Sequence, residues 1–147
     1  MPIRNRTLSL VLRLAIAAVF LVAGIEKWRG ADAFMEQIAN YQFYPEYSPF
    51  VALLLPPFEV VSALAVLFMR GRWRQAGALV ILGLLVVFTF AMARAWSLGI
   101  NIECGCFGTG SPNIGPLSFA RNGLMIAVCV AIFGLERDRR IAPKTFG

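Results

Sequence analysis

The stretch Ala76-Gly-Ala-Leu-Val-Ile-Leu-Gly-Leu-Leu-Val-Val-Phe-Thr-Phe-Ala-Met-Ala93 decides the fold, because it holds no charged side chain over 18 residues. A helix that crosses a bilayer needs about 20 predominantly apolar residues. The whole chain is also apolar: 59% of its 147 residues are hydrophobic, 15% are charged, and the mean hydropathy is +0.70. A soluble domain is roughly half apolar and a quarter charged. We therefore expect an integral membrane protein.

Three more apolar segments have a similar length, and they are Leu8–Ile25, Phe50–Met69 and Leu117–Gly134. Each of the three contains one ionisable residue, in chain order Arg13, Glu59 and Arg121. Backbone groups in lipid must be hydrogen-bonded within their own segment, and these runs lack the alternation of membrane strands. The sequence predicts one domain over residues 1–147, an all-α membrane protein with a bundle of four transmembrane helices. The third helix is expected to continue to about Trp96.

The distribution of charge sets the expected topology. Nine basic residues lie near the two termini and in the second loop, namely Arg4, Arg6, Arg70, Arg72, Arg74, Arg137, Arg139, Arg140 and Lys144. The loops on the other side hold Lys27, Arg29 and Arg94, with the acids Glu26, Asp32, Glu36, Glu46 and Glu103. The positive-inside rule then places both termini in the cytoplasm. This topology accounts for the net charge of +6, so nucleic acid is not an expected partner.

The first outer loop contains an amphipathic pattern. Phe34, Ile38 and Tyr41 are spaced i, i+4 and i+7. This spacing predicts a short extracytoplasmic helix that lies on the membrane surface.

The strongest chemical signal is Cys104-Gly-Cys106, which lies in the outer loop after the third segment. In a bacterial inner membrane this loop faces the periplasm, a compartment that permits disulfides. Residues i and i+2 come within bridging distance only if the backbone bends, and Gly105 allows that bend. Strained or exposed disulfides tend to be labile, which suits thiol–disulfide exchange. We expect Cys104 and Cys106 to be the catalytic pair; the alternatives are a metal site, a structural bridge or idle thiols.

Metal binding fits the sequence less well than exchange does. The chain has three cysteines and no histidine, whereas a closed zinc site usually takes four Cys and His ligands. Two thiolates could still hold Cu(I), because soft sulfur selects it. The third cysteine, Cys129, falls within the last apolar segment, and we expect it to be a small buried hydrophobe.

Ionisable residues in or near the spans form a second group of candidates. A charge inside a membrane usually faces the bundle interior or water. Five such residues could converge beneath the cysteine loop and support it, namely Lys27, Glu59, Arg94, Glu103 and Arg121. Nearby cations would lower the pKa of a thiol, and Glu103 would raise it. The alternative role is a structural Glu–Arg pair that holds the helices together.

Four short motifs together resemble a known family. They are Ala23-Gly24-x-x-Lys27 at the end of the first segment, Leu55-Pro56-x-x-Glu59, Cys104-Gly105-Cys106-Phe107-Gly108, and Arg121-Asn122. The chain resembles the DoxX-like membrane proteins, specifically their methylamine-utilisation MauE branch, over roughly residues 8–135. The resemblance implies a four-helix bundle linked to redox processes outside the cytoplasm. It also implies a thioredoxin-like partner, a maturing disulfide-rich protein, and a membrane quinone as a candidate cofactor.

These observations favour a thiol–disulfide oxidoreductase in which Cys104 and Cys106 exchange with a thioredoxin-like or disulfide-containing partner. One alternative is a non-enzymatic accessory subunit of a larger membrane complex. A second is a carrier of metal or a small solute that uses the region of Glu59 and Arg121.

Overall fold

The computed structural model describes the backbone of residues 2–105 and 112–141. Its helices are α1 (Pro2–Arg29), α2 (Ala31–Asn40), the 3-10 turn η1 (Pro45–Tyr47), α3 (Ser48–Phe68), α4 (Arg72–Ser97) and α5 (Pro116–Ile141). Four of them, α1, α3 (with η1), α4 and α5, include stretches long and apolar enough to cross a membrane. The prediction of an all-α, four-helix membrane protein is confirmed, and the chain is a multi-pass membrane protein.

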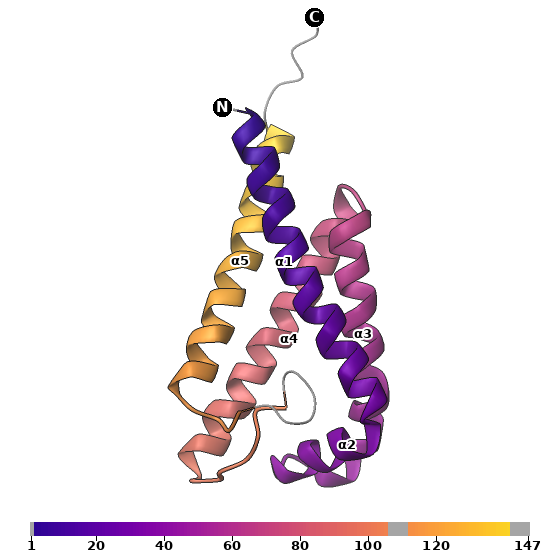
Figure 1. Cartoon of the computed structure of the whole chain (residues 1–147), viewed down its shortest axis with the longest axis vertical. Coiled ribbons are helices and arrows are strands. Elements are labelled where there is room, and N and C mark those ends of the chain that lie inside the picture. The colour runs from indigo at the N-terminus through magenta and orange to yellow at the C-terminus, as the bar shows by residue number, and fades with distance from the viewer. Residues whose placement is uncertain (1, 106–111, 142–147) are drawn as a thin grey trace, which may run out of the picture.

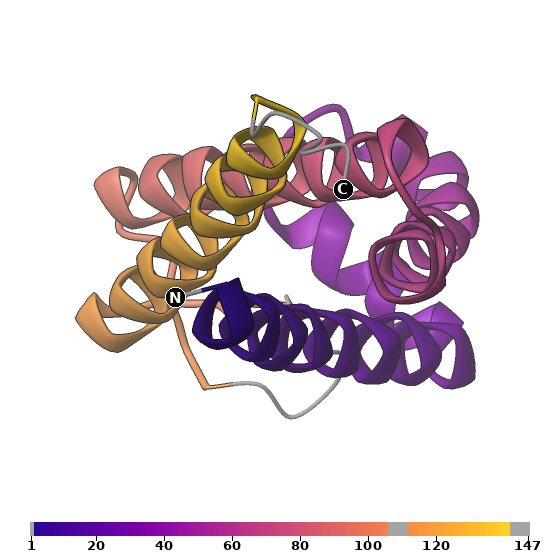
Figure 2. The ribbon, with the colours of Figure 1, turned by 90° about the horizontal axis from the view of Figure 1, so that it is seen from above.

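The four long helices form a bundle (Figures 1 and 2). Helix α1 packs against α3 and α5, and α4 also packs against α3 and α5, so the bundle closes in the order α1–α3–α4–α5. The core is built from buried side chains of all four helices, including Phe20, Ala63, Ile81 and Ile132. Cys129 belongs to this core and is 1% exposed, which confirms its prediction as a buried residue.

Two glycines let the helices approach closely. A Cβ on Gly24 of α1 would lie 2.8 Å from a methyl group of Val60 in α3. A Cβ on Gly77 of α4 would lie 2.9 Å from both the Ala65 Cβ and the Ser62 carbonyl oxygen of α3. Small residues at such crossings let backbones pack tightly, which is how helices associate in lipid. Helices α1 and α4 therefore both pack directly against the backbone and the short side chains of α3 at these two glycines.

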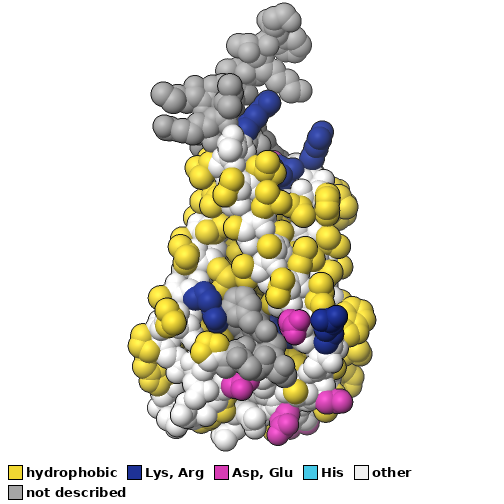
Figure 3. Space-filling view, in the orientation of Figure 1, with side chains coloured by type: hydrophobic (Ala, Val, Ile, Leu, Met, Phe, Trp, Pro, Cys, Tyr) yellow, Lys and Arg dark blue, Asp and Glu magenta, His cyan; other side chains and the backbone are white. Residues whose placement is uncertain are grey.

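On the face shown in Figure 3, charged side chains lie toward the two ends of the bundle. The acidic ones gather at the end that carries α2, where basic side chains lie as well, and an apolar surface separates this end from basic side chains at the far end. Arg74, which the sequence placed in the second loop, lies within α4 and is buried. Its Nη1 donates to the Glu136 carboxylate of α5 at 2.8 Å. The expected loop position of Arg74 was therefore wrong, because α4 already begins at Arg72.

We expect Gly77→Ala to destabilise the bundle by about 1–3 kcal/mol, the usual range for overpacking. Gly83 in the same helix is the matched control, because a Cβ there meets nothing within 4 Å. Thermal unfolding of both variants in one detergent, followed by circular dichroism, measures the difference. Equal melting temperatures for the two variants would contradict the close α3–α4 contact.

Candidate functional site

Cys104 lies in the connection between α4 and α5, described up to Gly105 and again from Pro112. The two described arms meet, because the Cys104 backbone N–H donates to the Pro112 carbonyl at 3.1 Å. Gly105 has a φ of +66°, a left-handed conformation that glycine adopts without the strain of a Cβ. The second predicted catalytic residue, Cys106, lies outside the described residues.

The sulfur of Cys104 is held among α4, α5 and the loop, and Cys104 is only 2% exposed. Its Sγ lies 3.2 Å from Met92 Sδ of α4 and accepts a hydrogen bond from Arg121 Nη2 of α5 at 3.4 Å. The residue after Arg121, Asn122, is fully buried and donates to Thr89 Oγ1 of α4 at 3.2 Å. This hydrogen bond ties α5 to α4 and thereby helps to hold Arg121 beside the sulfur.

Helix α2 holds the cysteine loop from the other side. Tyr41 Oη donates to the Cys104 carbonyl at 2.6 Å, and Gln37 Nε2 donates to the Glu103 carboxylate at 2.9 Å. The predicted short helix is confirmed, but its apolar face turns into the protein rather than toward lipid, and Phe34 is buried. The loop supplies two hydrogen-bond acceptors, the Glu103 carboxylate and the Cys104 carbonyl. These hydrogen bonds hold α2 across this end of the bundle.

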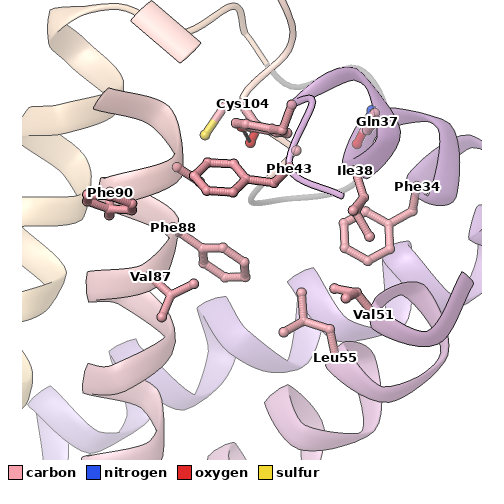
Figure 4. A pocket seen from close by; sticks show the side chains of 13 residues that line it. Phe34, Gln37, Ile38, Phe43, Val51, Leu55, Val87, Phe88, Phe90 and Cys104 are labelled. Atoms are coloured by element: carbon pink, nitrogen blue, oxygen red, sulfur yellow. Dashed lines mark hydrogen bonds between the residues drawn. The ribbon is translucent and has the colours of Figure 1, made fainter. Parts of the chain in front are cut away.

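A cavity of about 280 Å³ lies directly beside Cys104 (Figure 4). It is bounded by α2, α3, α4 and the cysteine loop. Its walls are apolar and rich in aromatic rings, contributed by Phe34, Tyr41, Phe43, Phe88 and Phe90. The lining also includes aliphatic side chains, namely Ile38, Val51, Leu55 and Val87. Cys104 is therefore in contact with a space that can take an apolar molecule.

Lys27 and Glu59 form a buried ion pair beside this cavity. Lys27 Nζ lies 2.5 Å from Glu59 Oε1, and both side chains are at most 1% exposed. Lys27 Nζ also lies 5.3 Å and 4.9 Å from the ring centres of Phe34 and Phe88, which line the cavity. The expected position of Lys27 was wrong, because Lys27 lies in the last turns of α1 rather than beyond its end. The partner of Glu59 is this lysine, whereas the alternative left open by the sequence was a Glu–Arg pair.

The five predicted supporting residues thus do not converge on one point but lie in three groups. Arg121 and Glu103 hold the cysteine loop, and Lys27 pairs with Glu59. Arg94 is separate from both, because its guanidinium carbon stacks 4.3 Å from the Phe43 ring centre. The sequence could not pair these residues, since each pair joins segments that are far apart in the chain.

The family model of the methylamine utilisation protein MauE matches residues 5–135. The chain belongs to the MauE family. The methylamine utilization protein MauE of Methylophilus methylotrophus is 35% identical over 107 residues, which are 71% of this chain and 55% of that protein. The MauE of Paracoccus denitrificans is 32% identical over 124 residues, which are 82% of this chain and 66% of that protein. The chain therefore spans less than two thirds of these curated relatives. No solved structure matches it.

Sequence reasoning missed several residues around the sulfur of this MauE-family chain. Met92 belongs to the uncharged span and carries no signal that distinguishes it from other apolar residues. Gln37 and Tyr41 lie on the polar and apolar edges of a short helix, and only the fold brings them to the loop. Among residues 6–105 and 112–137, whose side chains are described, no group of three His, Cys, Asp or Glu residues could hold a metal.

We expect Lys27→Met and Glu59→Gln, each made alone, to destabilise the protein strongly. Removal of one partner leaves the other polar group buried and uncompensated, which typically costs about 3–5 kcal/mol. The double variant Lys27→Met/Glu59→Leu should recover most of the loss, because apolar replacement of a buried pair is often neutral. Unfolding of all three in detergent measures this, and single variants as stable as the wild type would rule out the pair.

Proposed function

We propose that this protein serves methylamine utilisation in the bacterial inner membrane by thiol–disulfide exchange through Cys104 and Cys106 in the periplasm. The observation that carries the proposal is the contact between Arg121 Nη2 and Cys104 Sγ at 3.4 Å. A neighbouring cation favours the thiolate, which is the form that attacks a disulfide. A cysteine kept only as apolar filling would gain nothing from a guanidinium at its sulfur.

The exchange reaction needs two displacements. The Cys104 thiolate attacks one sulfur of the partner's disulfide, forms a mixed disulfide, and releases the partner's other sulfur as a thiolate that takes up a proton. The Cys106 thiolate then attacks Cys104, closes the Cys104–Cys106 disulfide, and releases the second partner thiol. The partner gains two electrons and two protons, and the same steps in reverse oxidise it. A thioredoxin-like or disulfide-containing periplasmic protein has the chemistry of such a partner.

The burial of Cys104 sets a condition on this reaction. At 2% exposure, its sulfur cannot be reached by a partner protein until the loop moves away from the bundle. The loop is held by Tyr41 and Gln37 of α2, so those two hydrogen bonds must break when the partner docks. We therefore infer that the partner binds over α2 and the cysteine loop.

A membrane quinone is the second proposed partner, and the cavity beside Cys104 fits its ring. An apolar cavity of about 150 Å³ suffices for benzene, and this cavity is about 280 Å³. Phe34, Phe43 and Phe88 would hold the ring by aromatic contacts. A bound quinone would supply an acceptor for two electrons and two protons. The protein's part is to hold Cys104 beside the cavity, of which it is a lining residue.

A non-enzymatic accessory subunit is the alternative function, and the same burial of Cys104 favours it. In that case the sulfur would pack among Met92 and neighbouring side chains without reacting. The protein would then be isolated in a stable membrane complex, and loss of both thiols would leave methylamine-dependent growth unchanged.

We expect the Cys106→Ser variant to trap a disulfide between Cys104 and a periplasmic partner, because the resolving thiol is missing. The trapped species is detected in cells as a reducible band and identified by mass spectrometry. The Cys104→Ser/Cys106→Ser variant is its control and should trap nothing. Normal methylamine-dependent growth of the double variant would instead support the accessory function.

We expect Arg121→Gln to slow alkylation of Cys104 several-fold at pH 7, because less of the sulfur is then thiolate. Arg121→Lys should keep part of the rate. Arg72→Gln is the matched control, since Arg72 is exposed in the first turn of α4. The rate is measured by mass spectrometry after reduction and treatment with N-ethylmaleimide. Equal rates in all variants would remove Arg121 from the proposal.

A further inference from the structure

Phe43 is held in an unusual turn between α2 and η1. Its neighbours Gln42 and Tyr44 have φ of +55° and +43°, and among the described residues they are the two non-glycine positions with positive φ. A left-handed conformation costs a residue with a Cβ about 1–2 kcal/mol. Such backbone strain persists where the surrounding structure requires it, and it often occurs at ligand sites.

The turn directs the Phe43 ring into the wall of the cavity beside Cys104 (Figure 4). The ring lies 4.3 Å from the Arg94 guanidinium carbon and 6.2 Å from the Phe90 ring centre. Both contacts come from α4, whereas the turn itself belongs to the α2–η1 segment. Phe43 therefore bridges the α2–η1 segment and α4, and a cation–π contact of this kind is worth about 0.5–1 kcal/mol at an exposed site.

The same wall of the cavity faces the membrane. Val87 and Phe90 line the cavity, yet they are 61% and 65% exposed on the outside of the bundle. Val51, which also lines it, is 40% exposed. These residues belong to α3 and α4, two of the spanning helices. A molecule dissolved in the bilayer can therefore reach this wall without passing through water.

We propose that the cavity beside Cys104 is reached sideways from the bilayer between α3 and α4, and that Phe43, stacked against Arg94, is the gate that admits a lipid-soluble quinone ring. The inference rests on the proposed function, because it assigns a route and a gate to the second partner. The cation–π contact is weak enough to open on binding, and the strain in the turn lowers the cost of leaving the closed conformation.

The lining favours a ring over a lipid acyl chain as the occupant. Five aromatic side chains surround the space, and aromatic pairs gain about 0.5–1.5 kcal/mol beyond the burial of their area. A flat ring in this space would also lie beside Cys104, which is one of the lining residues. An acyl chain would gain only apolar contact.

The test uses the full-length protein in lipid nanodiscs and a photoreactive azido-benzoquinone with a short alkyl tail. Brief illumination followed by mass spectrometry should locate the label on residues 87–91 and on Phe43. An excess of unlabelled decyl-benzoquinone should suppress it. Phe43→Ala should raise the labelling rate at least threefold by opening the gate, and Ala91→Trp should abolish labelling by filling the cavity.

Phe50→Ala is the matched control, because Phe50 of α3 is 64% exposed and does not line the cavity. Its labelling rate should equal that of the wild type. Thermal unfolding of every variant in the same nanodiscs excludes misfolding as the cause of a change. An unchanged labelling rate in Phe43→Ala would overturn the proposal that Phe43 is a gate. If a photoreactive fatty acid labels the cavity and decyl-benzoquinone fails to compete with it, the proposal that the occupant is a quinone ring is overturned.

A second experiment tests the exchange reaction independently of quinone binding. It uses the Cys106→Ser variant in the same preparation to trap the mixed disulfide between Cys104 and its partner. A trapped partner without quinone labelling of the cavity would overturn this inference and leave the exchange reaction standing. Labelling of the cavity without a trapped partner would overturn the exchange reaction and leave the ligand site standing.

Discussion

The buried ion pair between Lys27 and Glu59 is the contact on which the outer half of the protein depends. It joins the last turns of α1 to the middle of α3, and a charged pair in a span is costly unless both partners are in place. The Lys27 ammonium also contacts the rings of Phe34 and Phe88. The pair therefore fixes the end of α1, the start of α2 and one wall of the cavity at the same time.

Helix α2 transmits this arrangement to the cysteine loop. Helix α2 begins two residues after α1 ends. The position of Lys27 in the last turns of α1 therefore determines which parts of the protein the side chains of α2 can contact. Its buried Phe34 packs toward the ion pair, while Gln37 and Tyr41 bind Glu103 and the Cys104 carbonyl. One short helix thus connects the charged interior of the bundle to the backbone of the proposed redox loop.

The environment of Cys104 combines two requirements that usually conflict. Arg121 supplies a cation that favours a reactive sulfur, whereas burial against Met92 shields that sulfur from solvent. A thiol protected in this way reacts only when the loop opens or when a ligand is already in the apolar cavity. In the proposed exchange reaction, this arrangement would limit reaction of Cys104 with small thiols.

The sequence by itself determined the membrane class and the four spans, and it predicted the cysteine loop as the candidate site. Apolar runs such as Ala76–Ala93 are sufficient for the class and the spans. In lipid the backbone N–H and C=O groups of such a run must be hydrogen-bonded within the protein, and a helix does this within its own segment. The partners of Lys27, Arg74 and Arg121 were decided only by the tertiary structure. Each of these contacts joins different helices, and their choice depends on how far each helix extends and how closely glycines such as Gly77 let them pack. The cavity beside Cys104 was likewise invisible in the sequence, since its walls come from four separate segments.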